Sequence, residues 1–195
     1  VVGSLTVIVV FALVRTIAGT TAGLLASLFF AISPIIILRG SLGWFKSEPL
    51  GLLFGLLALY LFLSGIRSDK GNISLAKVFG GGILLAFGLA SWGGVQFLIL
   101  PIGLFLIALP FLRKDNKFII WTSVTFTVVF FLVYLALEGF QFGVFTTSLT
   151  GLYLDACTGI MVGCVIVKRI TKEQLRYAFA FLAGTIIAGI SVVSS

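Results

Sequence analysis

Eight long apolar segments separated by short polar loops make up this sequence. Globular domains carry about 25% charged residues, whereas only 10% of the residues here are charged and 60% are hydrophobic. A water-soluble core of this size could not cover so much apolar surface, so the surrounding solvent must be lipid. The segments are Val1–Val14, Thr20–Leu38, Leu50–Ile66, Val78–Ser91, Val95–Leu112, Phe118–Leu137, Thr150–Val167 and Tyr177–Val193.

These segments are expected to be helices, because lipid offers the backbone no hydrogen-bond partners and only helices or closed barrels can span it. The runs are too long for barrel strands and lack the strict alternation of apolar and polar residues. The sequence therefore predicts an all-α, polytopic membrane bundle with about eight transmembrane helices. Residues 1–195 would form a single transmembrane domain, and we expect it to be an excised part of a longer chain, because Val1 already lies inside an apolar run.

The basic residues alternate from loop to loop. Eleven of the 13 lie in alternate loops, counted from the first, and only Arg39 and Lys46 lie in the others. Because loops rich in Lys and Arg stay in the cytoplasm, the segment Leu38–Pro49 is predicted to be extracytoplasmic. This distribution accounts for the net charge of +7 without a nucleic-acid partner. The eleven are Arg15, Arg67, Lys70, Lys77, Arg113, Lys114, Lys117, Lys168, Arg169, Lys172 and Arg176.

The loop Leu38–Pro49 is the candidate for chemistry. It places Arg39, Lys46 and Glu48 between two apolar runs that contain no ionisable residue. An arginine offers a planar fork for phosphate, and a carboxylate can hold a hard cation such as Mg²⁺. A phosphate-bearing lipid substrate would need both, although charged loops are commonly only solvated helix ends. The sequence contains no His, which removes the usual general base and the commonest zinc ligand.

Three other features have structural interpretations. Gly80–Gly82 and Gly88 predict close helix packing through small residues. Cys157 and Cys164 are interpreted as structural thiols. Asp155 lies about one turn inside the seventh segment, where it is either solvated at the membrane interface or held by a partner.

Several motifs, in order along the chain, resemble the catalytic subunit of oligosaccharyltransferase. Thr21–Ala26, then Ser33-Pro34, then Arg39–Glu48 follow the family's "GAGLLAA", proline and "R-S-x-A-G-x-[FY]-D-x-[DE]" with the same spacing. Ala90–Phe97 is similar to its "S-[AS]-W-G-G-x-x-F", and Thr171–Leu175 is similar to a cytoplasmic loop further along. The arginine loop and the tryptophan–glycine segment are the more specific matches.

The resemblance implies a C-type glycosyltransferase (GT-C) architecture with active-site loops on the extracytoplasmic face. Such an enzyme transfers an oligosaccharide from a polyprenyl (dolichyl) phosphate or diphosphate carrier to Asn in the Asn-x-Ser/Thr sequence of an acceptor polypeptide, assisted by Mn²⁺ or Mg²⁺. The resemblance favours an archaeal-type single-subunit enzyme of the cell membrane. A eukaryotic enzyme would lie in the endoplasmic reticulum membrane, and accessory subunits are compatible with either.

The family pattern also implies roles for the loop residues. Glu48 falls on the second acid of the metal motif, so it is expected to be catalytic and to ligate the metal. Arg39 begins the motif and is expected to be catalytic and to bind the substrate phosphate. Lys46 replaces the first acid; it would either contact the phosphate as a point charge or pair with Glu48. The family's first D-x-D loop, its later external loop with a catalytic Glu and its W-W-D-Y-G domain are not in this chain, so we expect it to be incomplete as an enzyme.

Two other functions remain alternatives. Another GT-C glycosyltransferase that uses a polyprenyl-linked sugar would share the topology but not the tryptophan–glycine segment. A multi-span transporter would carry polar residues near the middle of its spans and an internal repeat, neither of which the sequence displays. A purely structural membrane scaffold gives no reason for the Arg39–Glu48 loop.

Overall fold

The computed structural model describes residues 2–34, 37, 47–68, 71–112, 115–138 and 149–170. Within these ranges every regular element is helical, which confirms the all-α prediction. The last predicted segment, Tyr177–Val193, lies outside the described residues. The elements are α1 (Val2–Ala18), α2 (Thr20–Ile32), α4 (Glu48–Arg67), α5 (Gly71–Ser91), the short 3₁₀ turn η1 (Gly93–Val95), α6 (Gln96–Leu112), α7 (Asn116–Leu137) and α9 (Leu149–Ile170).

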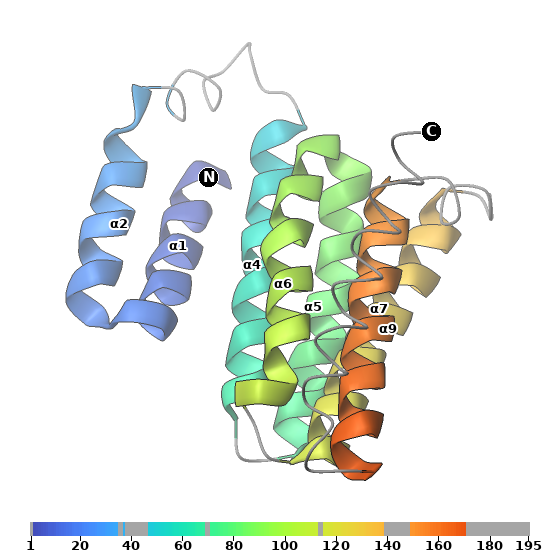
Figure 1. Cartoon of the computed structure of the whole chain (residues 1–195). Helices are drawn as coiled ribbons and strands as arrows, with labels where there is room; N and C mark the ends of the chain where they lie inside the picture. The colour runs from blue at the N-terminus through green and yellow to red at the C-terminus, as the bar shows by residue number, and fades with distance from the viewer. Residues whose placement is uncertain are drawn as a thin grey trace.

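The helices run side by side and alternate in direction along the chain, as expected of a polytopic membrane bundle (Figure 1). Among the described residues, four helices are long and apolar enough to cross a membrane: α4, α5, η1 continued by α6, and α7. Each has 20 or 21 residues in its apolar span, which at 1.5 Å per residue covers the hydrocarbon thickness of about 30 Å. The apolar stretches of α1, α2 and α9 are shorter.

Several helix boundaries differ from the predicted segments, and the largest difference is at the beginning of α5. Helix α5 begins at Gly71 rather than Val78, because a polar helix end can extend beyond the lipid. Helix α2 ends at Ile32, while Leu38, where the predicted segment ends, lies outside the described residues. Ser33 has an extended backbone (φ −64°, ψ 120°), since the ring of the following Pro34 disfavours a helical conformation at the residue before it.

A single glycine joins α1 to α2. Gly19 has φ +92°, a conformation that costs glycine little and other residues more. Its N–H donates to the carbonyl of Arg15 (3.1 Å), and its own carbonyl accepts from the N–H of Gly23 (3.1 Å). The two helices therefore form a tight hairpin, which stands beside α4 in Figure 1.

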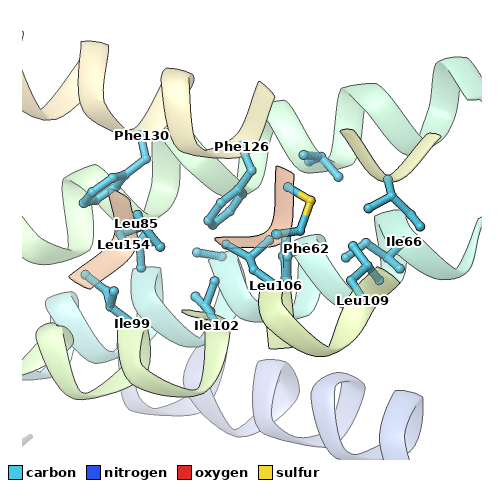
Figure 2. Packing of buried hydrophobic residues seen from close by; sticks show 14 of the residues in the cluster. Phe62, Ile66, Leu85, Ile99, Ile102, Leu106, Leu109, Phe126, Phe130 and Leu154 are labelled. Carbon is cyan, nitrogen blue, oxygen red and sulfur yellow. The ribbon is translucent and has the colours of Figure 1, made fainter. Parts of the chain in front are cut away.

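The core lies between α4, α5, α6, α7 and α9, where large apolar side chains from all five helices meet (Figure 2). Phe62 of α4 is fully buried, and its ring centroid lies 4.5 Å from that of Phe126 of α7. Leu106 of α6 and Leu154 of α9 are buried in the same cluster. Aromatic pairs at this spacing contribute about 0.5–1.5 kcal/mol beyond their buried area.

Helix α5 packs against its neighbours through its glycines, as predicted. A Cβ built on Gly81 would lie 3.2 Å from the carbonyl oxygen of Ala58 in α4. One built on Gly82 would lie 2.9 Å from the carbonyl oxygen of Phe126 in α7. Helix α5 is therefore held between two backbones, and a side chain at Gly82 would require α5 or α7 to shift.

Helix α9 is joined to the bundle by hydrogen bonds as well as packing. The hydroxyl of Tyr153 donates to the carbonyl of Leu100 in α6 (2.8 Å), and the hydroxyls of Thr158 and Thr127 lie 3.1 Å apart. Cys157 and Cys164 are buried free thiols. Asp155 lies on the exposed face of the helix, so the described part of the bundle does not bury it.

Candidate functional site

Glu48 begins α4, directly after the candidate loop. Ser47 precedes the helix, Pro49 occupies its first turn, and the N–H of Gly51 donates to the carbonyl of Ser47 (2.9 Å). Proline is favoured there because the first N–H groups of a helix have no partner within it. An acid in the first turn also interacts favourably with the helix dipole. Glu48 is half-buried, so its side chain is accessible at the end of the helix.

The tryptophan–glycine turn lies against this first turn of α4. A Cβ built on Gly51 would lie 2.5 Å from the Cβ of Trp92 and 3.2 Å from the carbonyl oxygen of Gly88. One built on Gly88 would lie 3.1 Å from the backbone nitrogen of Gly55. Helices α4 and α5 thus touch backbone to backbone where α4 begins and α5 ends. The first turn of α4 and the tryptophan–glycine segment, far apart in sequence, therefore meet at one end of the bundle.

The turn itself has a defined geometry. Trp92 is extended (φ −153°, ψ 118°), and its N–H donates to the carbonyl of Gly88 (2.9 Å). The carbonyl of Trp92 accepts from the N–H of Val95 (3.0 Å). The indole ring folds back over Gly94, where a Cβ would lie 2.3–2.6 Å from three of its carbon atoms.

Basic side chains mark the opposite end of α4. The guanidinium of Arg67 donates to the carbonyl of Thr16 at the end of α1. The ammonium of Lys77 donates to the hydroxyl of Ser64 (2.8 Å). These bonds place the ends of α1 and α4 and the beginning of α5 together. Among the described residues, Glu48 and these basic side chains therefore lie at opposite ends of α4, as predicted.

Two of the three predicted site residues cannot be placed relative to Glu48. Arg39 and Lys46 lie outside the described residues, and their roles stay predictions. Within the described ranges no group of three or more His, Cys, Asp or Glu side chains could hold a metal ion. Among the predicted site residues, Glu48 is the one that the structure describes.

A comparison with known families identifies the family of this chain. The sequence profile described as "Oligosaccharyl transferase STT3, N-terminal" matches residues 1–192. The chain belongs to the STT3 oligosaccharyl transferase family. The resemblance seen in the motifs is thereby confirmed, and it extends over almost the entire chain.

A curated plant relative agrees with this assignment. The "Dolichyl-diphosphooligosaccharide--protein glycosyltransferase subunit STT3B" of Oryza sativa subsp. japonica is 31% identical over 104 residues. The match covers 53% of this STT3-family chain and 14% of the plant protein. The aligned region thus spans only a small part of the relative's length.

Sequence reasoning singled out the loop that holds Glu48 and the segment that holds Trp92 but did not connect them. The structure connects them through Gly51, three residues after Glu48. A signal was present in the sequence: Gly51 and Gly55 are four residues apart in α4, and glycines at this spacing commonly mark the contact face of a membrane helix.

Proposed function

We propose that this STT3-family chain is part of the membrane domain of an oligosaccharyltransferase. The enzyme would transfer an oligosaccharide from a polyprenyl phosphate or diphosphate carrier to Asn in Asn-x-Ser/Thr sequences of an acceptor polypeptide. The observation that carries the proposal is the meeting of the Glu48 turn and the Trp92 turn at the end of the bundle away from Arg67 and Lys77. Membership in the STT3 family favours glycosyl transfer over transport.

Glu48 would act as a metal ligand. One carboxylate fits the way Mg²⁺ is commonly held in enzymes, by one or two carboxylates together with the phosphates of the substrate. When bound, Mn²⁺ or Mg²⁺ would stabilise the negative charge on the departing phosphate oxygens. The carboxylate at the beginning of α4 also counters the positive end of the helix dipole, which would otherwise oppose a cation there.

Arg39 and Lys46 would bind the phosphate groups of the carrier. The arginine can donate two parallel hydrogen bonds to one phosphate, and the lysine can contribute a point charge. In this proposal Lys46 replaces, electrostatically, one of the metal–carboxylate contacts of the family pattern. Both residues come from the loop that leads into Glu48, so they would approach the substrate from the same side.

A matched pair of acid variants tests the role of Glu48. Glu48→Gln in the full-length enzyme should lower kcat/KM for glycosylation of an Asn-x-Ser/Thr peptide by about 100-fold or more, the range expected for losing a charge that stabilises the transition state. Glu138→Gln is the control, because Glu138 ends α7 at the same end of the bundle but lies outside the motif. Equal activity of the two variants would contradict the proposal.

The orientation of the bundle can be tested separately. The proposal puts the Glu48 end outside the cytoplasm, in a cell membrane or facing the lumen of the endoplasmic reticulum. Cysteines introduced at Ser47 and Ser68, which lie at opposite ends of α4, should react with a membrane-impermeant maleimide from opposite sides. Labelling of both from the same side would reject this topology.

A further inference from the structure

Gly51 brings the first turn of α4 against the backbone at the end of α5. A Cβ built on Gly51 would lie 2.5 Å from the Cβ of Trp92, 3.2 Å from the carbonyl oxygen of Gly88 and 3.3 Å from the backbone nitrogen of Trp92. A backbone nitrogen and a Cβ are common to almost all residues, so this contact does not depend on the indole. It depends on the absence of a side chain at Gly51.

The atoms that face Gly51 are held in place. The N–H of Trp92 donates to the carbonyl of Gly88 (2.9 Å), and a Cβ built on Gly88 would lie only 3.1 Å from the backbone nitrogen of Gly55. No flexible side-chain end lies in the path of a methyl group at Gly51. Because carbon atoms pack best at about 3.5–4.0 Å, such a methyl group requires the first turn of α4 to move away from α5 by about 1 Å.

This displacement would include Glu48. Glu48 lies three residues before Gly51, and the N–H of Gly51 donates to the carbonyl of Ser47 (2.9 Å). That hydrogen bond closes the turn that contains Glu48, so the turn moves as a unit. Functional side chains must be held to within about 0.5 Å, and a misplacement of about 1 Å can cost about 100-fold in rate.

We propose that Gly51 is a positioning residue for Glu48. Because it has no side chain, the first turn of α4 lies directly on the backbone of Gly88 and Trp92, and this contact fixes where the Glu48 carboxylate is held. The inference rests on the proposed metal role of Glu48. It adds a requirement to that role, namely that the residue three positions after the metal ligand must be a glycine.

The simpler interpretation is that Gly51 only permits close packing of α4 on α5, as glycines of membrane helices commonly do. Gly65 provides the matched control, because it packs against α5 near the opposite end of α4 from Glu48. A Cβ built on Gly65 would lie 2.8 Å from the Cγ2 of Val78 and 3.1 Å from the carbonyl oxygen of Ser74. If Gly51 only permitted packing, Gly51→Ala and Gly65→Ala would have the same consequences for metal binding.

Binding of Mn²⁺ to the full-length variants, followed by the electron paramagnetic resonance signal of the free ion, tests the positioning role. Gly51→Ala and Gly65→Ala should both lower the thermal unfolding midpoint, since both overpack the contact between α4 and α5. Gly51→Ala should in addition weaken Mn²⁺ binding about tenfold or more, whereas Gly65→Ala should bind Mn²⁺ as the wild type does. Equal Mn²⁺ binding by the two folded variants would overturn the proposal.

A milder variant covers the case in which Gly51→Ala does not fold. A Cβ built on Gly88 would lie 3.3 Å from the carbonyl oxygen of Gly51, so Gly88→Ala crowds the same turn from the side of α5 by a smaller amount. Gly88→Ala should then weaken Mn²⁺ binding relative to Gly65→Ala. Wild-type Mn²⁺ binding by Gly88→Ala would reject the positioning role.

Substitutions of Trp92 test the contact independently of the metal. Trp92→Gly removes the Cβ that Gly51→Ala would meet, and Trp92→Ala keeps it. Adding Gly51→Ala should therefore lower the unfolding midpoint less in the Trp92→Gly background than in the Trp92→Ala background, and equal losses would contradict the contact. If Glu48→Gln leaves Mn²⁺ binding intact, the metal role of Glu48 fails and the positioning role fails with it, whereas the unfolding midpoints still report whether Gly51 sets the spacing of α4 and α5.

Discussion

Two alanine substitutions in α5, two residues apart, isolate the energy of close helix packing. A Cβ at Gly82 would lie 2.9 Å from the carbonyl oxygen of Phe126 and 3.2 Å from the Cβ of Val129 in α7. A Cβ at Gly80 meets only the end of the Leu61 side chain, at 3.6 Å, which is an ordinary contact. Gly82→Ala must therefore move a backbone, and Gly80→Ala need not.

The expected difference in stability between the Gly80→Ala and Gly82→Ala variants follows from these distances. Both variants gain the helix propensity of Ala over Gly, about 1 kcal/mol, and this gain cancels in the comparison. Overpacking in a well-packed interior costs about 1–3 kcal/mol. Gly82→Ala should therefore be about 1–3 kcal/mol less stable than Gly80→Ala, even though the substitution is chemically the same.

The measurement is the thermal unfolding midpoint of the two purified full-length variants in the same detergent. Gly80→Ala should unfold at or above the wild-type temperature, and Gly82→Ala below the Gly80→Ala midpoint. The double variant should unfold between the two single variants, because the methyl at Gly80 adds helix propensity and causes no displacement. A Gly82→Ala midpoint equal to or higher than that of Gly80→Ala would refute the argument that backbone contact between α5 and α7 limits side-chain size.

Three further substitutions test polar groups. Ser123→Ala should raise the unfolding free energy by about 1 kcal/mol, because the Ser123 hydroxyl is buried with no hydrogen-bond partner in the described structure. Thr127→Val should lower it by about 0.6 kcal/mol, since it removes the hydrogen bond to Thr158 within the membrane; stabilisation by this variant would contradict the assignment of that bond. Lys46→Asp in the full-length enzyme should lower the Mn²⁺ concentration needed for half-maximal activity. Lys117→Asp, at the opposite end of the bundle, is the control. If both variants give the wild-type Mn²⁺ titration, Lys46 does not take the place of an acid.

Much of the fold could be predicted from the sequence, because the lipid imposes simple rules on it. About 20 apolar residues are needed to cross the hydrocarbon, and the predicted spans Leu50–Ile66 and Phe118–Leu137 lie within α4 and α7. The beginning of α5 at Gly71, seven residues before the predicted segment, depends on local chemistry that hydropathy does not report. The family, too, could be recognised from the motifs around Glu48 and Trp92.

The candidate site could be predicted only in part. The sequence singled out Glu48 by its place in a motif, and the structure placed Gly51, in the same helical turn, against Trp92. Arg39 and Lys46 lie outside the described residues, so their approach to Glu48 stays a prediction. The contact between Gly51 and Trp92 was not predicted, because glycine spacing indicates a contact face without indicating which residue meets it.

The amino-acid sequence by itself determined that this chain consists of apolar helices suited to a membrane, and that its basic residues lie mostly in alternate loops. Only the tertiary structure decided which faces of those helices meet. In lipid, the surface that faces the bundle and the surface that faces the membrane are both apolar: Phe97 is 67% exposed and Ile99, two residues on, is 1% exposed. Hydropathy cannot distinguish two such residues. Which helices become neighbours is therefore decided by close backbone contacts and interhelical hydrogen bonds. These interactions exist only once the helices have assembled.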